Sequence, residues 1–226
     1  MENFKRFAVY YAPRPGAFAS AAAAWLGWDA AQGRAVPQPD LIPGLAGITA
    51  APRKYGFHGT IRAPFRPGQG VTGAAIADAV AALATRVAPA SCAGLRLANL
   101  HGFLALVPDG TPGAILRLGA AVVEGTDALR APLTEAETAR RRPDRLSARQ
   151  RSLLTRWGYP FVMEEFQFHL TLSDRLGAEQ AETVGAAALA HLVPVLPRPF
   201  VIEDLCLFGE DDAGRFHLIH RYALTG

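Results

Sequence analysis

The chain has 226 residues, of which 50% are hydrophobic, so it is long enough to bury a sizeable core. The formal net charge is only +3, and the longest apolar run near the N-terminus, at 17–28, is too short and too interrupted to span a bilayer. Cys92 and Cys206 are far apart and have no metal-finger spacing. These features favour a globular, soluble, cytoplasmic monomer with no membrane contact, disulfide or zinc finger.

The first half of the chain is predicted to mix strands and helices around one long loop. Pro37, Pro39, Pro43 and Pro52 argue against a helix in that loop, and a loop of this length leading to His58 could form a flap over a site. The expected elements are a strand at 6–12, a helix at 17–28, the loop at 29–54, a strand carrying His58, a helix at 71–87 and a hairpin of strands 95–100 and 103–107.

The second half is predicted to repeat the later part of this order. Its expected elements are helices at 114–129 and 134–156, a strand at 161–172, a helix at 178–191 and a hairpin of strands 200–208 and 215–224. From each of His58 and His169 onward the order is strand, helix, hairpin. The pattern therefore predicts a duplicated α+β unit with two mainly antiparallel sheets.

A five-residue motif supports the duplication. The segment 57–61 reads Phe-His-Gly-Thr-Ile, and 111 positions later the segment 168–172 reads Phe-His-Leu-Thr-Leu. Because side chains alternate along a strand, the histidine and threonine of each copy share one face, with apolar residues on the other. A pseudo-twofold axis between the copies would bring His58 and His169 to a shared cleft.

Two facing imidazoles suit joint acid and base catalysis, since small differences in surroundings can leave one neutral and the other protonated. Thr60 and Thr171 would add hydroxyl donors for phosphoryl oxygens. Arg62, on the His58 face, would bind a second phosphate or form a structural salt bridge. A single histidine in a half-buried strand is usually only a hydrogen-bonded structural residue, but two copies in matching contexts favour a site. No HxH, HxxxH or carboxylate cluster accompanies either histidine, so no metal or other cofactor is expected.

Two HxT-aliphatic motifs half a chain apart resemble the two-histidine (2H) phosphoesterase superfamily. The segments 55–65, 156–160 and 164–172 are similar to its branch encoded in phosphonate-utilisation operons. The resemblance implies one domain over 1–226, with pseudo-symmetric lobes of about 1–109 and 110–226 whose two sheets face a central cleft, with helices outside. It also implies metal-independent hydrolysis of a cyclic phosphodiester, in which one imidazole accepts a proton from water and the other protonates the departing sugar oxygen.

By position, the resemblance assigns catalysis to His58, His169, Thr60 and Thr171. The expected substrate-binding residues are Arg62, Tyr55, Ser173 and Tyr159.

The substrate follows less directly from the sequence. The operon association points to a small molecule such as 5-phosphoribosyl 1,2-cyclic phosphate, whose second phosphate would suit an arginine. Seven arginines in 140–156 form either a solvated helix or a rim that attracts a multiply phosphorylated ligand or RNA. The alternatives are an RNA 2′,3′-cyclic phosphodiesterase, although no aromatic residues interleave with the arginines, and a non-catalytic protein that binds a phosphorylated ligand in the same cleft.

Overall fold

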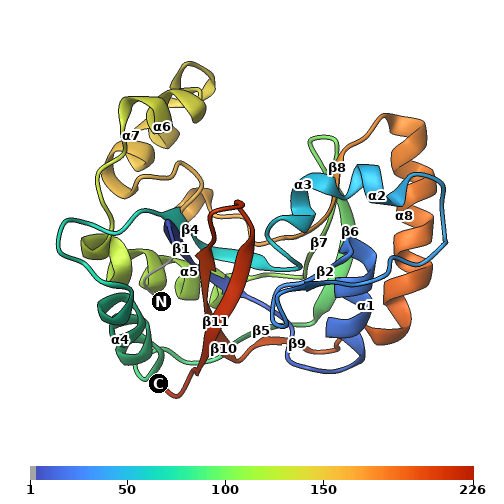
Figure 1. Ribbon diagram of the computed structural model, residues 1–226, viewed down its shortest axis with the longest axis horizontal. Coiled ribbons are helices and arrows are strands. Elements are labelled where there is room, and N and C mark those ends of the chain that lie inside the picture. Colours follow the sequence, from blue (N-terminus) through green and yellow to red (C-terminus); the bar gives the residue numbers. More distant parts are fainter. Residues whose placement is uncertain (1–3) are drawn as a thin grey trace.

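The computed structural model describes residues 4–226 and has an α+β fold built on a seven-stranded antiparallel sheet (Figure 1). The strand order is β11-β10-β1-β4-β8-β7-β6. The strands are β1 (Arg6–Tyr11), β4 (Gly59–Phe65), β6 (Gly94–Leu100), β7 (Phe103–Asp109), β8 (Leu170–Arg175), β10 (Asp204–Glu210) and β11 (Phe216–Ala223). Two short pairs complete the β-structure: β2 (Trp28–Asp29) with β3 (Arg34–Ala35), and β5 (Ala90–Cys92) with β9 (Phe200–Ile202).

Four helices supply most of the helical residues of the main core, and the other four rise on either side of the opposite face (Figure 1). The core helices are α1 (Ala17–Leu26), α4 (Gly73–Ala84), α5 (Gly113–Thr126) and α8 (Ala178–Leu192). The others are α2 (Leu45–Ile48), α3 (Ala50–Arg53), α6 (Glu135–Arg140) and α7 (Ala148–Trp157). Single 3₁₀ turns lie at Asp127–Leu129, Pro143–Arg145, Met163–Glu165 and Val193–Val195. None of the helices within residues 4–226 is both long and apolar enough to cross a membrane.

The predicted α+β class and antiparallel pairing are confirmed, and the two expected sheets are the halves of one sheet. They join where β4 pairs with β8 at Gly59↔Leu170. Each half takes strands from both parts of the chain, because the β6–β7 hairpin pairs with β8 while β10 pairs with β1 and so extends the half that contains β4. The expected lobes of 1–109 and 110–226 therefore do not coincide with the halves of the sheet.

In three segments the observed secondary structure differs from the expected one, and in each case the backbone conformation shows why. The loop 29–54 contains β2, β3, α2 and α3, and α3 accommodates Pro52 because a proline in the first turn has no intrahelical N–H bond to lose. The helix expected at 134–156 is broken at Arg142, which has φ of 49°, and at Pro143. The strand expected at 161–172 begins only at Leu170, after the 3₁₀ turn at Met163–Glu165.

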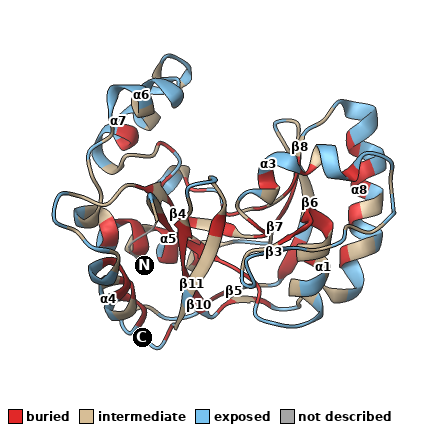
Figure 2. Cartoon of the chain, in the orientation of Figure 1, coloured by how far each residue is buried: buried red, intermediate tan, exposed pale blue. Residues whose placement is uncertain are grey.

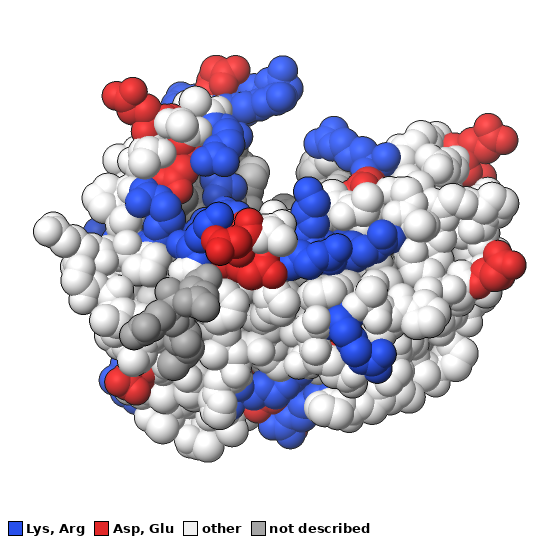
Figure 3. All heavy atoms as spheres, viewed as in Figure 1, with Lys and Arg blue, Asp and Glu red and all other residues white. Residues whose placement is uncertain are grey.

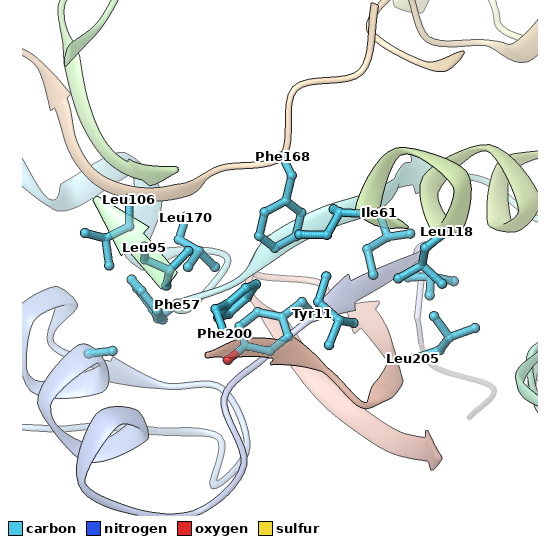
Figure 4. Packing of buried hydrophobic residues seen from close by; sticks show 14 of the residues in the cluster. Tyr11, Phe57, Ile61, Leu95, Leu106, Leu118, Phe168, Leu170, Phe200 and Leu205 are labelled. Carbon is cyan, nitrogen blue, oxygen red and sulfur yellow. The ribbon is translucent and has the colours of Figure 1, made fainter. Parts of the chain in front are cut away.

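The apolar faces of the two motifs meet in one core. Phe57, Ile61, Phe168 and Leu170 are all buried there and lie among residues from both halves of the sheet (Figure 4). The buried residues follow the strands and the inner faces of the helices, whereas the outer helix faces are exposed (Figure 2). The motif histidines and threonines therefore belong to the opposite face of the sheet, as the alternation predicts.

Candidate active site

The two motifs meet at the only register pair between β4 and β8 within the described chain, Gly59↔Leu170. These two residues are themselves 111 positions apart, so each is the repeat counterpart of the other. Pairing between equivalent positions of the two motifs is what a pseudo-twofold axis passing between the two strands at this pair requires. Counting outward along antiparallel strands, His58 lies beside Thr171 and His169 beside Thr60, all on one face. The strand register thus brings the four predicted catalytic residues together.

Gly59 makes this meeting of strands possible. A Cβ atom at Gly59 would lie only 2.4 Å from Cζ of Phe168, so the aromatic ring of the second motif occupies the space that a side chain would need. The second motif has Leu170 at the equivalent position, and its side chain is fully buried. The motifs differ at two positions, Gly59/Leu170 and Ile61/Leu172, and the first difference is therefore a packing requirement at the crossing point.

The imidazole of His58 is held in a defined tautomer. Its Nδ1 lies 2.9 Å from the carbonyl oxygen of Gly56, and its Nε2 lies 3.2 Å from Oγ1 of Thr60. A carbonyl oxygen can only accept, so Nδ1 carries the proton and, in the neutral ring, Nε2 accepts from the Thr60 hydroxyl. Gly56 has φ of +70° and a Cβ there would lie 2.6 Å from Cβ of Ala30, so the turn that presents this carbonyl needs glycine.

His169 is held in the same way. Its Nδ1 lies 2.8 Å from the carbonyl oxygen of Gln167, the residue two positions earlier, just as Gly56 precedes His58. The proton is again fixed on Nδ1, which leaves Nε2 available. The ring centroid lies 5.7 Å from that of Phe103. The repeat therefore extends to the hydrogen bond that orients each imidazole.

The surroundings of the two histidines nevertheless differ. Opposite Thr60 on β1 stands Tyr10, whose ring centroid lies 4.0 Å from that of His58, whereas Ala105 on β7 stands opposite Thr171. The His58 imidazole keeps some exposure to the cleft but is packed against Tyr10. Burial lowers the pKa of His58 to about 4, the Gly56 carbonyl opposes this shift, and the charge of His169 lowers the pKa further. His58 is thus neutral at pH 7.

Tyr10, His58, Thr60 and Thr171 line a cavity of about 410 Å³, called here the histidine cavity. Figure 3 shows this face hollowed between two rises, with Lys and Arg side chains on both sides. Ala51 and Pro52 from the loop 29–54 form part of its wall. Among the predicted site residues, the cavity is lined by His58, Thr60, Thr171, Tyr55, Tyr159 and Ser173. His169 is not a lining residue, although both Thr171 and Phe103 beside it are.

Ser173 and Arg62 have structural contacts that the sequence did not show. Ser173 is 1% exposed, and its hydroxyl accepts from the Leu104 amide and donates to the Asp174 carbonyl. Arg62 is 2% exposed and lies in an adjacent pocket rather than in the histidine cavity, where it contacts Asp127. Of the two roles expected for Arg62, the salt bridge is therefore present.

A β-bulge explains the position of Arg62. Tyr10 pairs with Thr60 but Val9 pairs with Arg62, so two residues of β4 advance against one of β1. The extra residue interrupts the alternation of faces on which the prediction depended.

Several lining residues were not predicted. They are Tyr10, Arg6, Phe103, Arg141, Asp174 and Arg175. Tyr10 is fully buried, and its hydroxyl oxygen has no hydrogen-bond partner within the described chain. In the sequence it stands in the apolar run of β1, where nothing distinguishes it from a core residue, whereas the arginine excess at 140–156 did point towards Arg141. No group of three or more His, Cys, Asp or Glu within residues 4–226 could hold a metal ion.

The site thus defines an α+β protein with twin histidines at the junction of two pseudo-symmetric strands. Residues 60–217 match the family described as a protein of unknown function, DUF1045, and the chain belongs to that family. The match begins two residues after His58 and includes His169.

Two relatives share more than a third of their aligned residues with the chain. A protein of Janthinobacterium sp. (strain Marseille) is 36% identical over 223 residues, and one of Laribacter hongkongensis (strain HLHK9) is 38% identical over 213 residues. Both bear the name ribose 1,5-bisphosphate phosphokinase PhnN. The alignments cover 94% and 92% of the chain but 49% of each relative, so the chain spans about half the length of these proteins. A solved structure described as a phosphoesterase aligns over 99% of both chains, at 12% identity and a TM-score of 0.45.

Proposed function

We propose that the protein is a metal-independent cyclic phosphodiesterase of the 2H type. The observation that carries this proposal is the matched pair of imidazoles: each follows a carbonyl two residues earlier that holds the Nδ1 proton, and each precedes a strand that starts at the shared crossing point. Two Nε2 atoms oriented towards one face are what an acid and a base need to act on a single phosphoryl group.

The difference in surroundings between His58 and His169 assigns the roles of base and acid. His58 is neutral at pH 7, so its Nε2 takes a proton from the attacking water while the water oxygen bonds to phosphorus. His169 donates the proton on its Nε2 to the sugar oxygen as the phosphorus–oxygen ester bond breaks, which opens the cyclic diester to a monoester. On substrate binding the Thr60 hydroxyl turns from Nε2 of His58 to the phosphate, and Thr60 and Thr171 then donate to the phosphoryl oxygens where negative charge develops. Proton exchange with solvent then restores both imidazoles.

The size of the cavity and the names of the relatives favour a small phosphorylated ribose. A cavity of about 410 Å³ lies at the small end of ligand sites. The relatives are named for ribose 1,5-bisphosphate, and the chain itself contains no Gly-x₄-Gly-Lys-Ser/Thr phosphate loop, so it lacks the motif of a P-loop kinase. We infer 5-phosphoribosyl 1,2-cyclic phosphate as the preferred substrate, in agreement with the resemblance to the phosphonate-operon branch.

The test is a screen of cyclic phosphodiesters with and without EDTA, using wild type, His169→Ala and His220→Ala. His220 is exposed on β11, outside the cavity, and serves as the matched control. We expect turnover that survives EDTA, is lost in His169→Ala and persists in His220→Ala. Absence of turnover on every substrate would leave a phosphate-binding protein, and a strong preference for RNA oligomers with 2′,3′-cyclic ends would replace the small-molecule assignment.

A further inference from the structure

A second pocket adjoins the histidine cavity and is rich in arginine. It shares Arg6, Ala63, Pro64, Arg141 and Tyr159 with that cavity, so the two spaces have a common wall. We call it the arginine pocket. The arginines that line it come from β1, β4 and the segments around α6, and they are Arg6, Arg62, Arg66, Arg130, Arg140 and Arg141.

The charges of this pocket are not balanced by the protein. Glu210 pairs with Arg6, Glu137 with Arg66, and Asp127 with both Arg62 and Arg130. Six arginines thus face three carboxylates. Within residues 4–226, neither Arg140 nor Arg141 has a carboxylate within salt-bridge distance. Arg141 instead lies over the ring of Tyr159, at 4.8 Å from its centroid.

Arg62 provides independent evidence that the pocket can bind an anion. Its side chain is only 2% exposed, yet Nε has no hydrogen-bond partner within the described chain. Its other contacts are long: Nη1 lies 3.3 Å from the Trp157 carbonyl oxygen and Nη2 lies 3.4 Å from Oδ1 of Asp127. A buried charge held this loosely is costly, and an anion in the pocket would supply the missing acceptor.

The dimensions suit a single phosphate group. The pocket has a volume of about 150 Å³, which is several times the space needed for one water but below that of a nucleotide site. The pocket and the histidine cavity have Ala63, Pro64 and Arg141 in common, so the two spaces adjoin. One small sugar could therefore place a phosphate in each.

We propose that the arginine pocket binds a second phosphate monoester of the substrate while the histidines act on its cyclic phosphodiester. This inference rests on the proposed function, which it deepens by assigning a separate site, the arginine pocket, to the terminal phosphate of the substrate. Arg140, Arg141 and Nε of Arg62 are the donors, and Tyr159 holds Arg141 at the boundary between the two spaces.

The experiment compares two substrates that differ in one group, 5-phosphoribosyl 1,2-cyclic phosphate and ribose 1,2-cyclic phosphate. We expect wild type to prefer the phosphorylated compound by at least ~10-fold in kcat/KM. Arg140→Gln, which alters only the arginine pocket, and Arg141→Gln should each remove most of that preference through KM, with little change on ribose 1,2-cyclic phosphate for Arg140→Gln. Arg145→Gln removes the same charge from an exposed neighbouring position and is the control.

A calorimetric titration with ribose 5-phosphate separates this inference from the proposed function, since it needs no turnover. We expect binding that weakens about 10-fold in Arg140→Gln but not in Arg145→Gln. Turnover of both substrates with equal kcat/KM would overturn the second site and leave the phosphodiesterase intact. Absence of turnover, with ribose 5-phosphate binding still dependent on Arg140, would overturn the enzyme and retain the site. Preference for an RNA oligomer would overturn the proposed substrate class.

Discussion

The burial of His58 predicts an unusually low acidic limit for activity. The base must be neutral to accept a proton, so kcat/KM falls as the pH drops through the pKa of His58, which burial lowers to about 4. At pH 5 a base with that pKa is still about 90% neutral, whereas a base with an ordinary histidine pKa of about 6.5 is only about 3% neutral. Measurement of kcat/KM on one cyclic nucleotide between pH 4 and 8 distinguishes the two cases.

Tyr10 provides the perturbation, because its ring packs on His58 at 4.0 Å between centroids. Tyr10→Ala should hydrate the imidazole and move the acidic midpoint upward from about 4 towards 6.5, while Tyr10→Phe keeps the ring and should leave the midpoint in place. Circular dichroism checks that Tyr10→Ala stays folded, since loss of a buried aromatic costs about 3–5 kcal/mol. A wild-type midpoint near 6.5, or a Tyr10→Ala midpoint that does not move, would refute the assignment of His58 as a desolvated base.

Further predictions concern the two histidines, Gly59 where β4 pairs with β8, the Tyr10 hydroxyl, and activity in the presence of EDTA. His58→Ala and His169→Ala should each lower kcat/KM by roughly 10²–10⁴-fold with almost unchanged thermal unfolding, and unfolding of either variant would indicate a structural role instead. Gly59→Ala should destabilise the protein by about 1–3 kcal/mol because its Cβ would overlap an aromatic ring, whereas Gly47→Ala, with nothing within 4 Å, should be nearly neutral in a melting experiment. Tyr10→Phe should stabilise the fold by about 1 kcal/mol, since it removes an unpaired buried hydroxyl; a lower melting temperature for this variant would mean that the hydroxyl has a partner. Full loss of activity in EDTA, restored by zinc or manganese, would contradict the metal-independent mechanism.

The repeat could be predicted from the sequence because its signals are local. The alternation in each motif places Phe57 and Phe168 in the core, and the His101-Gly102 turn and the β10–β11 hairpin follow from short-range turn chemistry. The union of the two half-sheets at Gly59↔Leu170 could not be predicted, because pairing between distant strands leaves no mark in periodicity.

The candidate site, too, could be predicted only where its sequence signals are local. The four motif residues were found because their types and spacing recur, but Arg62 was misplaced because a bulge changes which way a side chain points without changing the residue pattern. Tyr10 was missed because a buried tyrosine in an apolar strand has the same sequence signature whether its hydroxyl faces packing or a cavity.

The position of β1 in the sheet explains how the imidazoles of two equivalent motifs could take different roles, one as base and the other as acid. β1 occupies the position beside β4 that β7 occupies beside β8, and so it sets Tyr10, rather than an alanine like Ala105, opposite the first motif. An assembly of two equal copies of the repeat would give both imidazoles the same proton affinity, so neither would be committed to giving or taking a proton. In one continuous chain, a strand that belongs to neither repeat breaks that equivalence and, in the mechanism proposed above, sets the direction in which protons move across the substrate.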